Sequence, residues 1–299
     1  MIIHQSDLGS FGRCAAAFGY QLAGLPRRQT SALAFGTVMH YALEVLETER
    51  LNGASMDSAL EKATETFLWY WNPANIEVLT EPVSPDGWIM KQSYNGLRAQ
   101  GVRSLKQYAA MVRDMAEEIL ALEFSFQVPI QGTWDEELGE PHVLVGTIDR
   151  LTAKYMRGYD VLGFDDYKTG KQSKYLRQNL QFTAYAYAST QKEFWVGWRG
   201  EDGFRNHGEA LYERFKDSAR HGRWINMKDI SIADAGFRGP LDYHRLAVAV
   251  EQFAASVKAE IFPLTLVGEV CTFCDYRAVC AGSGVARDDH GAPWEQSEL

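Results

Sequence analysis

The sequence predicts an α/β protein with a mixed central sheet. Three observations support this class: helical spacing of apolar residues in the first third of the chain, alternating apolar and polar residues in three consecutive central segments, and a return to helical spacing afterwards. Helices, then a three-stranded meander, then a helix and a further strand are the order expected when helices cover a sheet. We therefore expect a sheet core flanked by helices.

The first part of the chain is predicted to be helical in three segments. One begins with Ser55 or Asp57 as its N-cap. Residues 73–90 contain three prolines and predict a loop. The predicted helices are residues 33–50, 55–71 and 91–122.

The second part alternates between strand and helix patterns. Polar, glycine-containing segments separate the first three strands, which favours an antiparallel meander. Residues 201–240 predict a short hairpin and a loop, and residues 281–299 a polar tail. The predicted strands are 123–130, 142–153, 159–169 and 193–200, and the predicted helices are 176–190 and 241–259.

Composition and charge limit the function classes. The chain has 299 residues, 46% of them hydrophobic, and no apolar run approaches the roughly 18 residues of a membrane span. Its start lacks a basic region followed by an apolar one, so we expect no signal peptide, a cytoplasmic location and no membrane partner. The net charge of −9 argues against a protein that coats nucleic acid, but it permits a site for divalent cations, which needs acidic residues.

A basic run follows the third predicted strand. It contains no acidic residue, and it fits either a phosphate contact beside a site or a solvated basic face. The run consists of Lys168, Lys171, Lys174 and Arg177.

Two acids and a lysine are predicted to meet on neighbouring strands. Asp166 and Lys168 alternate along the third strand, so their side chains point to the same side. Asp149 lies in the second strand and faces the same pocket if the two strands pair. Phosphodiester hydrolysis needs hard oxygen ligands for divalent ions and a cation that neutralises developing charge. Taken alone, Asp166 and Lys168 would also fit a surface salt bridge.

The sequence resembles the RecB-like branch of the PD-(D/E)XK nuclease superfamily at four motifs in the family's order. These are G-x-x-x-H at Gly36 to His40, GTIDRL at 146–151, DYKTGK at 166–171 and Q-x-x-x-Y at Gln181 to Tyr185. The resemblance implies a restriction-endonuclease-like mixed sheet and a metal-dependent deoxyribonuclease.

The resemblance also implies roles for single residues. Lys168 would be the catalytic lysine, and Gln181 and Tyr185 would line the site and position the lysine or the DNA. Taken singly, His40 and Tyr185 would fit ordinary core positions. The implied ligands of Mg²⁺ or Mn²⁺ are His40, Asp149, Asp166 and the carbonyl of Tyr167.

The cysteines of the chain predict a single metal site that joins its two ends. Cys14 stands near the start, and the other three form a C-x2-C-x5-C pattern at Cys271, Cys274 and Cys280. Four thiolates suit either zinc or an iron–sulfur cluster, and thiols in the cytosol are more often ligands than disulfides. Iron–sulfur members of the RecB-like branch, namely the AddB-type nuclease and CRISPR-associated exonucleases, have one cysteine before the core and three after it. This resemblance implies a [4Fe–4S] cluster.

The expected organisation is a nuclease core with a helical insertion. The core would comprise residues 1–50 and 123–280 with the iron–sulfur clasp, the insertion 51–122 and the tail 281–299. No G-x-x-x-x-G-K-[ST] motif is present, so we expect no helicase in the chain. The function expected is a DNA exonuclease acting on single strands or DNA ends in recombination or repair. The alternative is a nuclease or scaffold subunit of a CRISPR-adaptation or recombination complex, active only with a partner.

Overall fold

The computed structural model describes residues 1–27, 30–72, 94–170, 176–199 and 203–265, together with residues 271, 274–276, 279 and 280. The predicted loop 73–90, the tail 281–299 and two lysines of the basic run, Lys171 and Lys174, lie outside the described residues.

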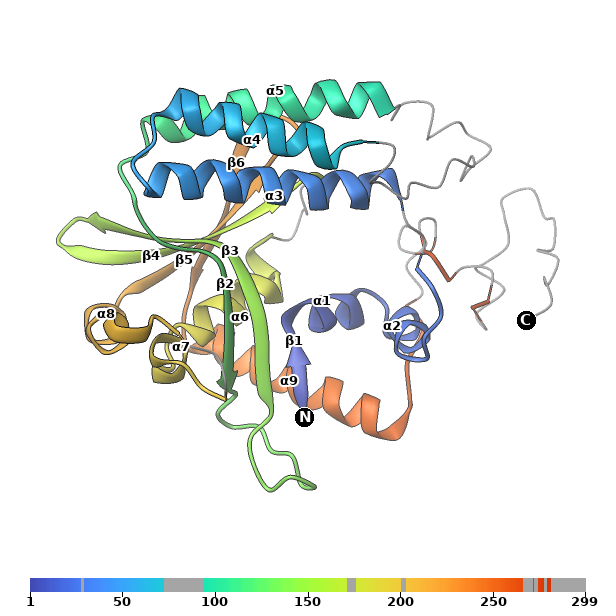
Figure 1. Ribbon diagram of the computed structural model, residues 1–299. Helices are drawn as coiled ribbons and strands as arrows, with labels where there is room; N and C mark the ends of the chain where they lie inside the picture. The colour runs from blue at the N-terminus through green and yellow to red at the C-terminus, as the bar shows by residue number, and fades with distance from the viewer. Residues whose placement is uncertain are drawn as a thin grey trace.

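Within the described residues, six strands form one mixed sheet at the centre of the molecule (Figure 1). They are β1 (Ile2–His4), β2 (Glu118–Pro129), β3 (Val143–Met156), β4 (Tyr159–Lys168), β5 (Ala219–Asn226) and β6 (Ser231–Arg238). The antiparallel pairs β2–β3 and β3–β4 confirm the predicted meander. β5 joins β4 in parallel and pairs antiparallel with β6, while β1 pairs in parallel with the start of β3. The expected mixed α/β class is confirmed.

Helices cover both faces of this sheet (Figure 1). One face carries α3 (Ser31–Leu51), α4 (Met56–Tyr70) and α5 (Tyr94–Arg113). The other carries α1 (Gln5–Arg13), α6 (Leu180–Ala188) and α9 (Pro240–Ala259). Shorter elements complete the fold: α2 (Ala15–Leu22), α7 (Lys192–Val196), α8 (Gly208–Phe215) and the 3₁₀ turns η2 (Leu176–Gln178) and η3 (Arg205–His207).

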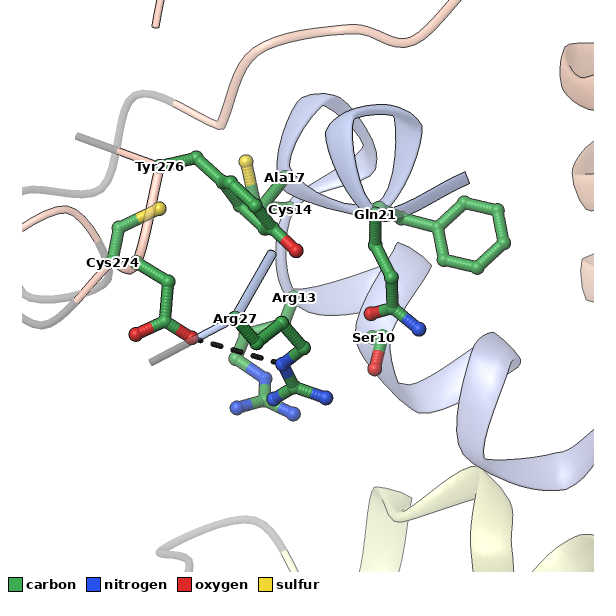
Figure 2. A pocket seen from close by; sticks show the side chains of 10 residues that line it. Ser10, Arg13, Cys14, Ala17, Gln21, Arg27, Cys274 and Tyr276 are labelled. Carbon is green, nitrogen blue, oxygen red and sulfur yellow. Dashed lines mark ion pairs between the residues drawn. The ribbon is translucent and has the colours of Figure 1, made fainter. Parts of the chain in front are cut away.

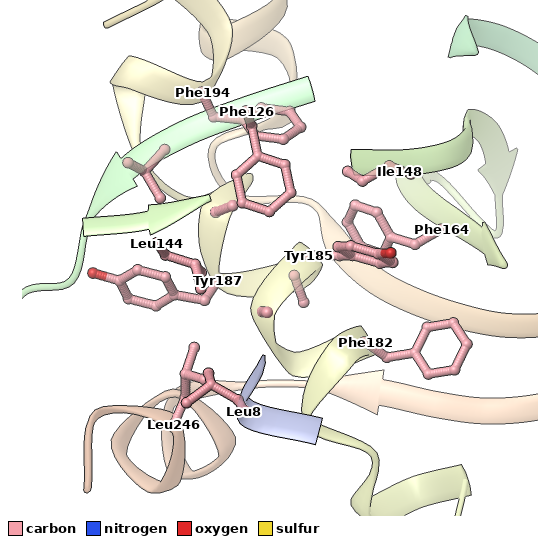
Figure 3. Close-up of a cluster of buried hydrophobic side chains, with 14 of the residues drawn as sticks. Leu8, Phe126, Leu144, Ile148, Phe164, Phe182, Tyr185, Tyr187, Phe194 and Leu246 are labelled. Carbon is pink, nitrogen blue, oxygen red and sulfur yellow. The ribbon is translucent and has the colours of Figure 1, made fainter. Parts of the chain in front are cut away.

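Each face of the sheet has its own hydrophobic core. On the α6 side, Ile148 and Phe164 of the sheet pack with Phe182 and Tyr185 of the helix (Figure 3). On the opposite side, α3, α4 and α5 share a cluster that includes Tyr167 of β4. Burial of this apolar area fixes both helical layers against the strands. Strand β4 is therefore held from both faces.

Side-chain caps set the starts of the helices that carry the predicted site residues. Thr30 accepts a hydrogen bond from the backbone N–H of Leu33 and so begins α3. Asn179 accepts one from the N–H of Gln181 and begins α6. Ser55 begins α4, which decides between the two predicted caps.

Two sequence expectations differ from the structure. The predicted strand 193–200 is wrong, because α7 occupies Lys192–Val196 and buries Phe194 and Trp195. A short apolar run cannot distinguish a buried strand from a buried helix. The predicted helix 91–122 is too long, since α5 ends at Arg113 and β2 begins at Glu118.

The remaining differences concern unpredicted elements. The hairpin expected within 201–240 is present as β5 and β6, but α8 precedes it. The first strand β1 and helices α1 and α2 had no prediction. None of the helices in the described part of the chain has the length and apolar character to span a membrane.

The expected insertion 51–122 corresponds to α4, α5 and the first residues of β2. Residues 118–122 pair with β3 and so belong to the sheet. The two helices share one cluster with α3, so the three form a single layer.

Candidate active site

The end of β4 carries the predicted acid and lysine. Asp166 and Lys168 lie on its α6 side, and Lys168 Nζ donates to Asp166 Oδ1 over 2.7 Å. Gln181 Nε2 donates to the same oxygen over 2.8 Å. The other oxygen of the fully buried Asp166 carboxylate, Oδ2, has no hydrogen-bond partner among the described residues. A buried carboxylate oxygen without a donor is costly unless a cation occupies the space before it.

Asp149 reaches this site through an irregularity in β3. Ile148 and Leu151 both belong to the core on the α6 side, so the alternation of side chains breaks between them. Asp149 Oδ2 accepts a hydrogen bond from the backbone N–H of Tyr167 over 2.7 Å, which holds it beside β4. Burial, and next the charge of Asp166, raise the pKa of Asp149 to about 7.

His40 is brought over the end of β4 by helix α3. One turn before it stands Gly36, where a Cβ would lie only 3.3 Å from Thr169 Oγ1. Glycine thus permits a close approach of helix and strand end. His40 Nε2 lies 3.1 Å from the carbonyl oxygen of Tyr167, and its Nδ1 lies 3.7 Å from Asp149 Oδ2.

Glu123 is a site residue that sequence reasoning missed. It lies in β2 between Leu122 and Phe124, which pair with Arg150 and Ile148 of β3, and its Oε1 is 3.7 Å from His40 Nδ1. Its φ of 44° is uncommon for a residue other than glycine, and such strain often marks functional sites. The available signal was an acid at the start of the apolar segment 123–130, on the strand next to Asp149.

The charges around His40 are mostly negative. Burial alone would lower the pKa of His40, but the carboxylates of Glu123 and Asp149 outweigh burial and raise it. Burial and the charge of Glu123 raise the pKa of Glu44, one helical turn further along α3. Burial would also lower the pKa of Lys168, yet Asp166 and Asp149 raise it. Lys168 therefore keeps its positive charge beside these carboxylates.

The residues present fit a divalent cation. Ligand atoms of His40, Glu123 and Asp149 lie within 4.8 Å of one another. Asp166 is not part of this group, but it carries a buried oxygen without a hydrogen-bond partner among the described residues, and the Tyr167 carbonyl oxygen lies 3.1 Å from His40 Nε2. Carboxylate and carbonyl oxygens are the donors that Mg²⁺ and Mn²⁺ prefer. The imidazole of His40 is compatible with Mn²⁺.

Helix α6 carries two side chains that support the Asp166 carboxylate. Gln181 and Tyr185 are four residues apart and therefore share a helix face. Gln181 Nε2 contacts Tyr185 Oη at 2.7 Å as well as Asp166 Oδ1. Burial and the charges of Asp166 and Asp149 raise the pKa of Tyr185 well above its usual value, so its hydroxyl stays neutral. The structure thus brings together all the predicted residues of the acid–lysine site.

A pocket of about 390 Å³ opens onto this site between α3 and the strand end. Its lining comes from α3 and from the chain around the end of β4. The pocket exposes His40 and Lys168 together with Tyr41.

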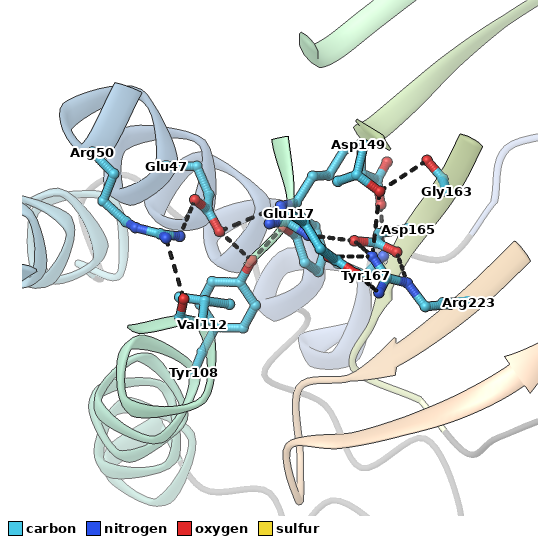
Figure 4. A network of polar contacts seen from close by, with 12 residues as sticks. Glu47, Arg50, Tyr108, Val112, Glu117, Asp149, Gly163, Asp165, Tyr167 and Arg223 are labelled. Carbon is cyan, nitrogen blue, oxygen red and sulfur yellow. Dashed lines mark hydrogen bonds and ion pairs between the residues drawn. The ribbon is translucent and has the colours of Figure 1, made fainter. Parts of the chain in front are cut away.

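The opposite face of β4 carries a buried ion network (Figure 4). Arg150 Nη1 and Arg223 Nε each donate to the carboxylate of Asp165 over 2.6 Å. Arg223 also binds Glu117. Arg150 Nε lies 3.6 Å from Glu47 Oε1, which ties the network to α3.

The same network reaches the helical layer through two tyrosines. Tyr108 of α5 donates to Glu47 Oε1, and its Oη lies 2.6 Å from Tyr167 Oη. Arg50 binds the other oxygen of Glu47. Three arginines therefore face three carboxylates behind the site: Arg50, Arg150 and Arg223 against Glu47, Glu117 and Asp165.

The predicted cysteines lie at the junction of the chain ends. Cys14 lies between α1 and α2 and, with Cys274, lines a pocket of about 140 Å³ (Figure 2). Burial, followed by the charges of Cys14 and Cys280, raises the pKa of the Cys274 thiol. Cys271 Sγ lies 3.9 Å from the Thr265 carbonyl oxygen, and hydrogen bonds from Thr265 lower the pKa of the Cys14 thiol against the effect of burial. All four are free cysteines.

A helix-covered mixed sheet, with acids, a histidine and a lysine at one strand end, defines a class of α/β proteins equipped to bind a divalent cation. This chain belongs to the PD-(D/E)XK nuclease superfamily, whose family model matches residues 4–281. That superfamily suggests a metal-dependent nuclease, and a nuclease of this kind acts on DNA.

The similarity to known structures and to curated proteins is weaker. A solved structure described as "Crystal structure of SSO0001" is similar at 11% sequence identity and a TM-score of 0.35, covering 94% of this chain and 86% of that one. Among curated proteins, none matches the sequence.

Proposed function

We propose that this protein is a metal-dependent deoxyribonuclease of the RecB-like branch that hydrolyses phosphodiester bonds. The observation that carries the proposal is the cluster of Glu123, Asp149 and Asp166 around His40 and Lys168, with Asp166 Oδ2 left without a donor among the described residues. Such an arrangement destabilises the protein unless a cation binds, so a structural role alone accounts for it poorly.

In this proposal each side chain has a task at a named atom. His40, Asp149, Asp166 and the Tyr167 carbonyl hold Mg²⁺ or Mn²⁺, and Glu123 joins them. The ion supplies Lewis acidity for the phosphate and lowers the pKa of a bound water. Lys168 Nζ, held by Asp166 Oδ1, neutralises the charge that develops on the phosphate.

Helix α6 holds the Asp166 carboxylate in place through hydrogen bonds. Gln181 donates to Asp166 Oδ1, which helps to fix the orientation of the carboxylate. Tyr185 anchors the Gln181 amide and, as a neutral hydroxyl, adds no charge to the site. Both therefore position the acid and lysine.

For the substrate, we propose exonuclease action on single-stranded DNA or DNA ends. The four RecB-like motifs support this choice. The second candidate is a subunit of a CRISPR-adaptation or recombination complex that cuts only with its partner. The chain has a net charge of −9, although a basic run lies near the site. This negative charge favours protein partners over a role in coating DNA.

We propose further that Cys14, Cys271, Cys274 and Cys280 hold a [4Fe–4S] cluster. The donor set supports it: four free thiols from both chain ends. Four thiolates suit zinc as well, so the choice of the cluster over zinc rests on the resemblance to the iron–sulfur members of the RecB-like branch. Free thiols also fit the cytoplasmic location we propose.

Nuclease assays on the anaerobically purified protein test the proposal. The substrates are end-labelled single-stranded DNA, duplex DNA and a single-stranded circle, each with Mg²⁺ or Mn²⁺. Wild type should shorten linear DNA from its labelled ends and spare the circle, while Lys168→Ala should be inactive. Lys216→Ala, which removes an exposed lysine paired with Glu213, is the matched control and should be active.

Three outcomes count against parts of this proposal. Cutting of the circle would replace the exonuclease by an endonuclease. Equal cutting by Lys168→Ala would contradict the site. No cutting by wild type with its cluster intact would reject the stand-alone enzyme and favour the partner-dependent subunit. Visible absorbance of the purified protein separates iron–sulfur from colourless zinc.

A further inference from the structure

Three aromatic side chains are exposed next to the candidate active site. Tyr41 of α3 is 44% exposed, and Tyr70 and Trp69 at the end of α4 are 37% and 62% exposed. Their neighbour Trp71 is 1% exposed and packs on Phe67 and Tyr94. The end of α4 therefore has a core side and an aromatic side facing outward. Leaving large rings in water forgoes their burial energy, so a cluster of them indicates a binding surface.

The three rings form one continuous surface across two helices. The Tyr41 and Tyr70 centroids are 4.9 Å apart with an interplanar angle of 37°. Trp69 and Tyr70 are 4.6 Å apart in an edge-to-face arrangement at 88°. These contacts hold the rings in place, so little conformational entropy remains to be lost when a ligand binds.

This aromatic surface is continuous with the active-site pocket. Tyr41 follows His40 directly in α3, and it lines the same pocket as His40 and Lys168. A ligand with its phosphate at Lys168 therefore has its neighbouring groups over Tyr41.

We propose that Tyr41, Tyr70 and Trp69 form a stacking platform for the unpaired bases of a single nucleic-acid strand whose backbone enters the pocket. The inference rests on the proposed nuclease function and deepens it by naming the residues that select the substrate. Every base offers a π-face, so such a platform tolerates any sequence. Bases of a duplex are already stacked on one another, so the platform selects unpaired strands.

Binding measurements test the platform without cleavage. The Lys168→Ala protein serves as the background, and fluorescence anisotropy follows a labelled thymidine oligonucleotide, an abasic strand of equal length and a duplex. Adding Tyr70→Ala or Trp69→Ala should weaken binding of the thymidine strand about tenfold and leave the abasic strand unchanged. Tyr70→Phe should restore tight binding because the ring remains.

A matched control separates this effect from general loss of aromatic surface. Tyr155 is 71% exposed near the β3–β4 turn, about 20 Å along the strand from Asp149. Tyr155→Ala should bind all three probes as the background does. Thermal unfolding should show that the alanine variants remain folded.

The outcomes distinguish the platform from the nuclease proposal. If wild type cleaves DNA but Tyr70→Ala and Trp69→Ala bind the thymidine strand normally, the platform is wrong and the nuclease stands. An equal loss for the abasic strand would also reject stacking, since no base is present. If the protein neither cuts nor binds DNA, both proposals fail, and the surface serves another partner such as a protein.

Discussion

Asp165 and Asp166 lie on opposite faces of strand β4 and are equally buried, but their carboxylates have different partners. On the face toward α3 and α5, Asp165 receives hydrogen bonds from Arg150 and Arg223. On the face toward α6, Asp166 accepts hydrogen bonds from one lysine and one amide on a single oxygen, and its second oxygen has no partner in the described part of the chain. Adjacent residues of one strand thus lie in a neutralised network and in an unsatisfied cluster.

The balance of charge separates structure from function. Behind the strand, three arginines match three carboxylates. In front, among the described residues, Glu123, Asp149 and Asp166 form their ion pairs with Lys168 and His40. A matched network stabilises or fixes the fold. Unmatched acids are tolerated where a cation completes them, so the second face is the one that binds a ligand.

The largest effect on activity is expected when the charge of Asp166 is removed. Asp166→Asn should lower the cleavage rate by on the order of 10³-fold, because it removes a metal-binding oxygen and the anchor of Lys168. Stability should change little, since the substitution removes one charge from a repelling cluster. Cleavage rates and thermal unfolding measure both effects. A variant that keeps more than about a tenth of the activity would contradict the assigned role.

Breaking the matched network should affect stability instead. Arg150→Met leaves Asp165 and Glu47 with fewer partners in the core and should cost about 3–5 kcal/mol of unfolding free energy. The control is Arg177→Met, which breaks an exposed pair with Asp234 and should cost less than about 1 kcal/mol. Denaturant unfolding measures both. Equal costs would mean that the network is not structural.

The smallest expected effect concerns acid stability. Burial alone would raise the pKa of Glu117, but Arg223 and Arg150 outweigh it and lower the pKa below its usual 4.5. A lowered pKa contributes stability that is present above 4.5 and is lost as pH falls through the lowered value. Glu117→Gln should therefore show a shallower loss of melting temperature between about pH 6 and about pH 3. An unchanged slope would show that this ion pair contributes nothing.

The sequence predicted the sheet class, the meander and most helices because their apolar periodicity is long and regular. It predicted Asp149, Asp166, Lys168 and His40 because these stand in motifs. It did not predict Glu123, an acid at the start of the apolar segment 123–130 that stands outside the four motifs and has a left-handed backbone conformation. The ion network was equally hidden: Glu117 and Arg223 are far apart in the chain, and only strand pairing brings them together.

Binding of Mn²⁺ to the metal-free protein tests the comparison most directly. Titration calorimetry on wild type should show binding that Asp149→Asn and Glu123→Gln weaken at least about tenfold, because each removes a ligand. Glu117→Gln, a similar change on the matched face, should bind Mn²⁺ as wild type does. Unchanged binding by the two site variants, or an equal loss in Glu117→Gln, would contradict the claim that the unmatched acids of β2, β3 and β4 form the metal centre.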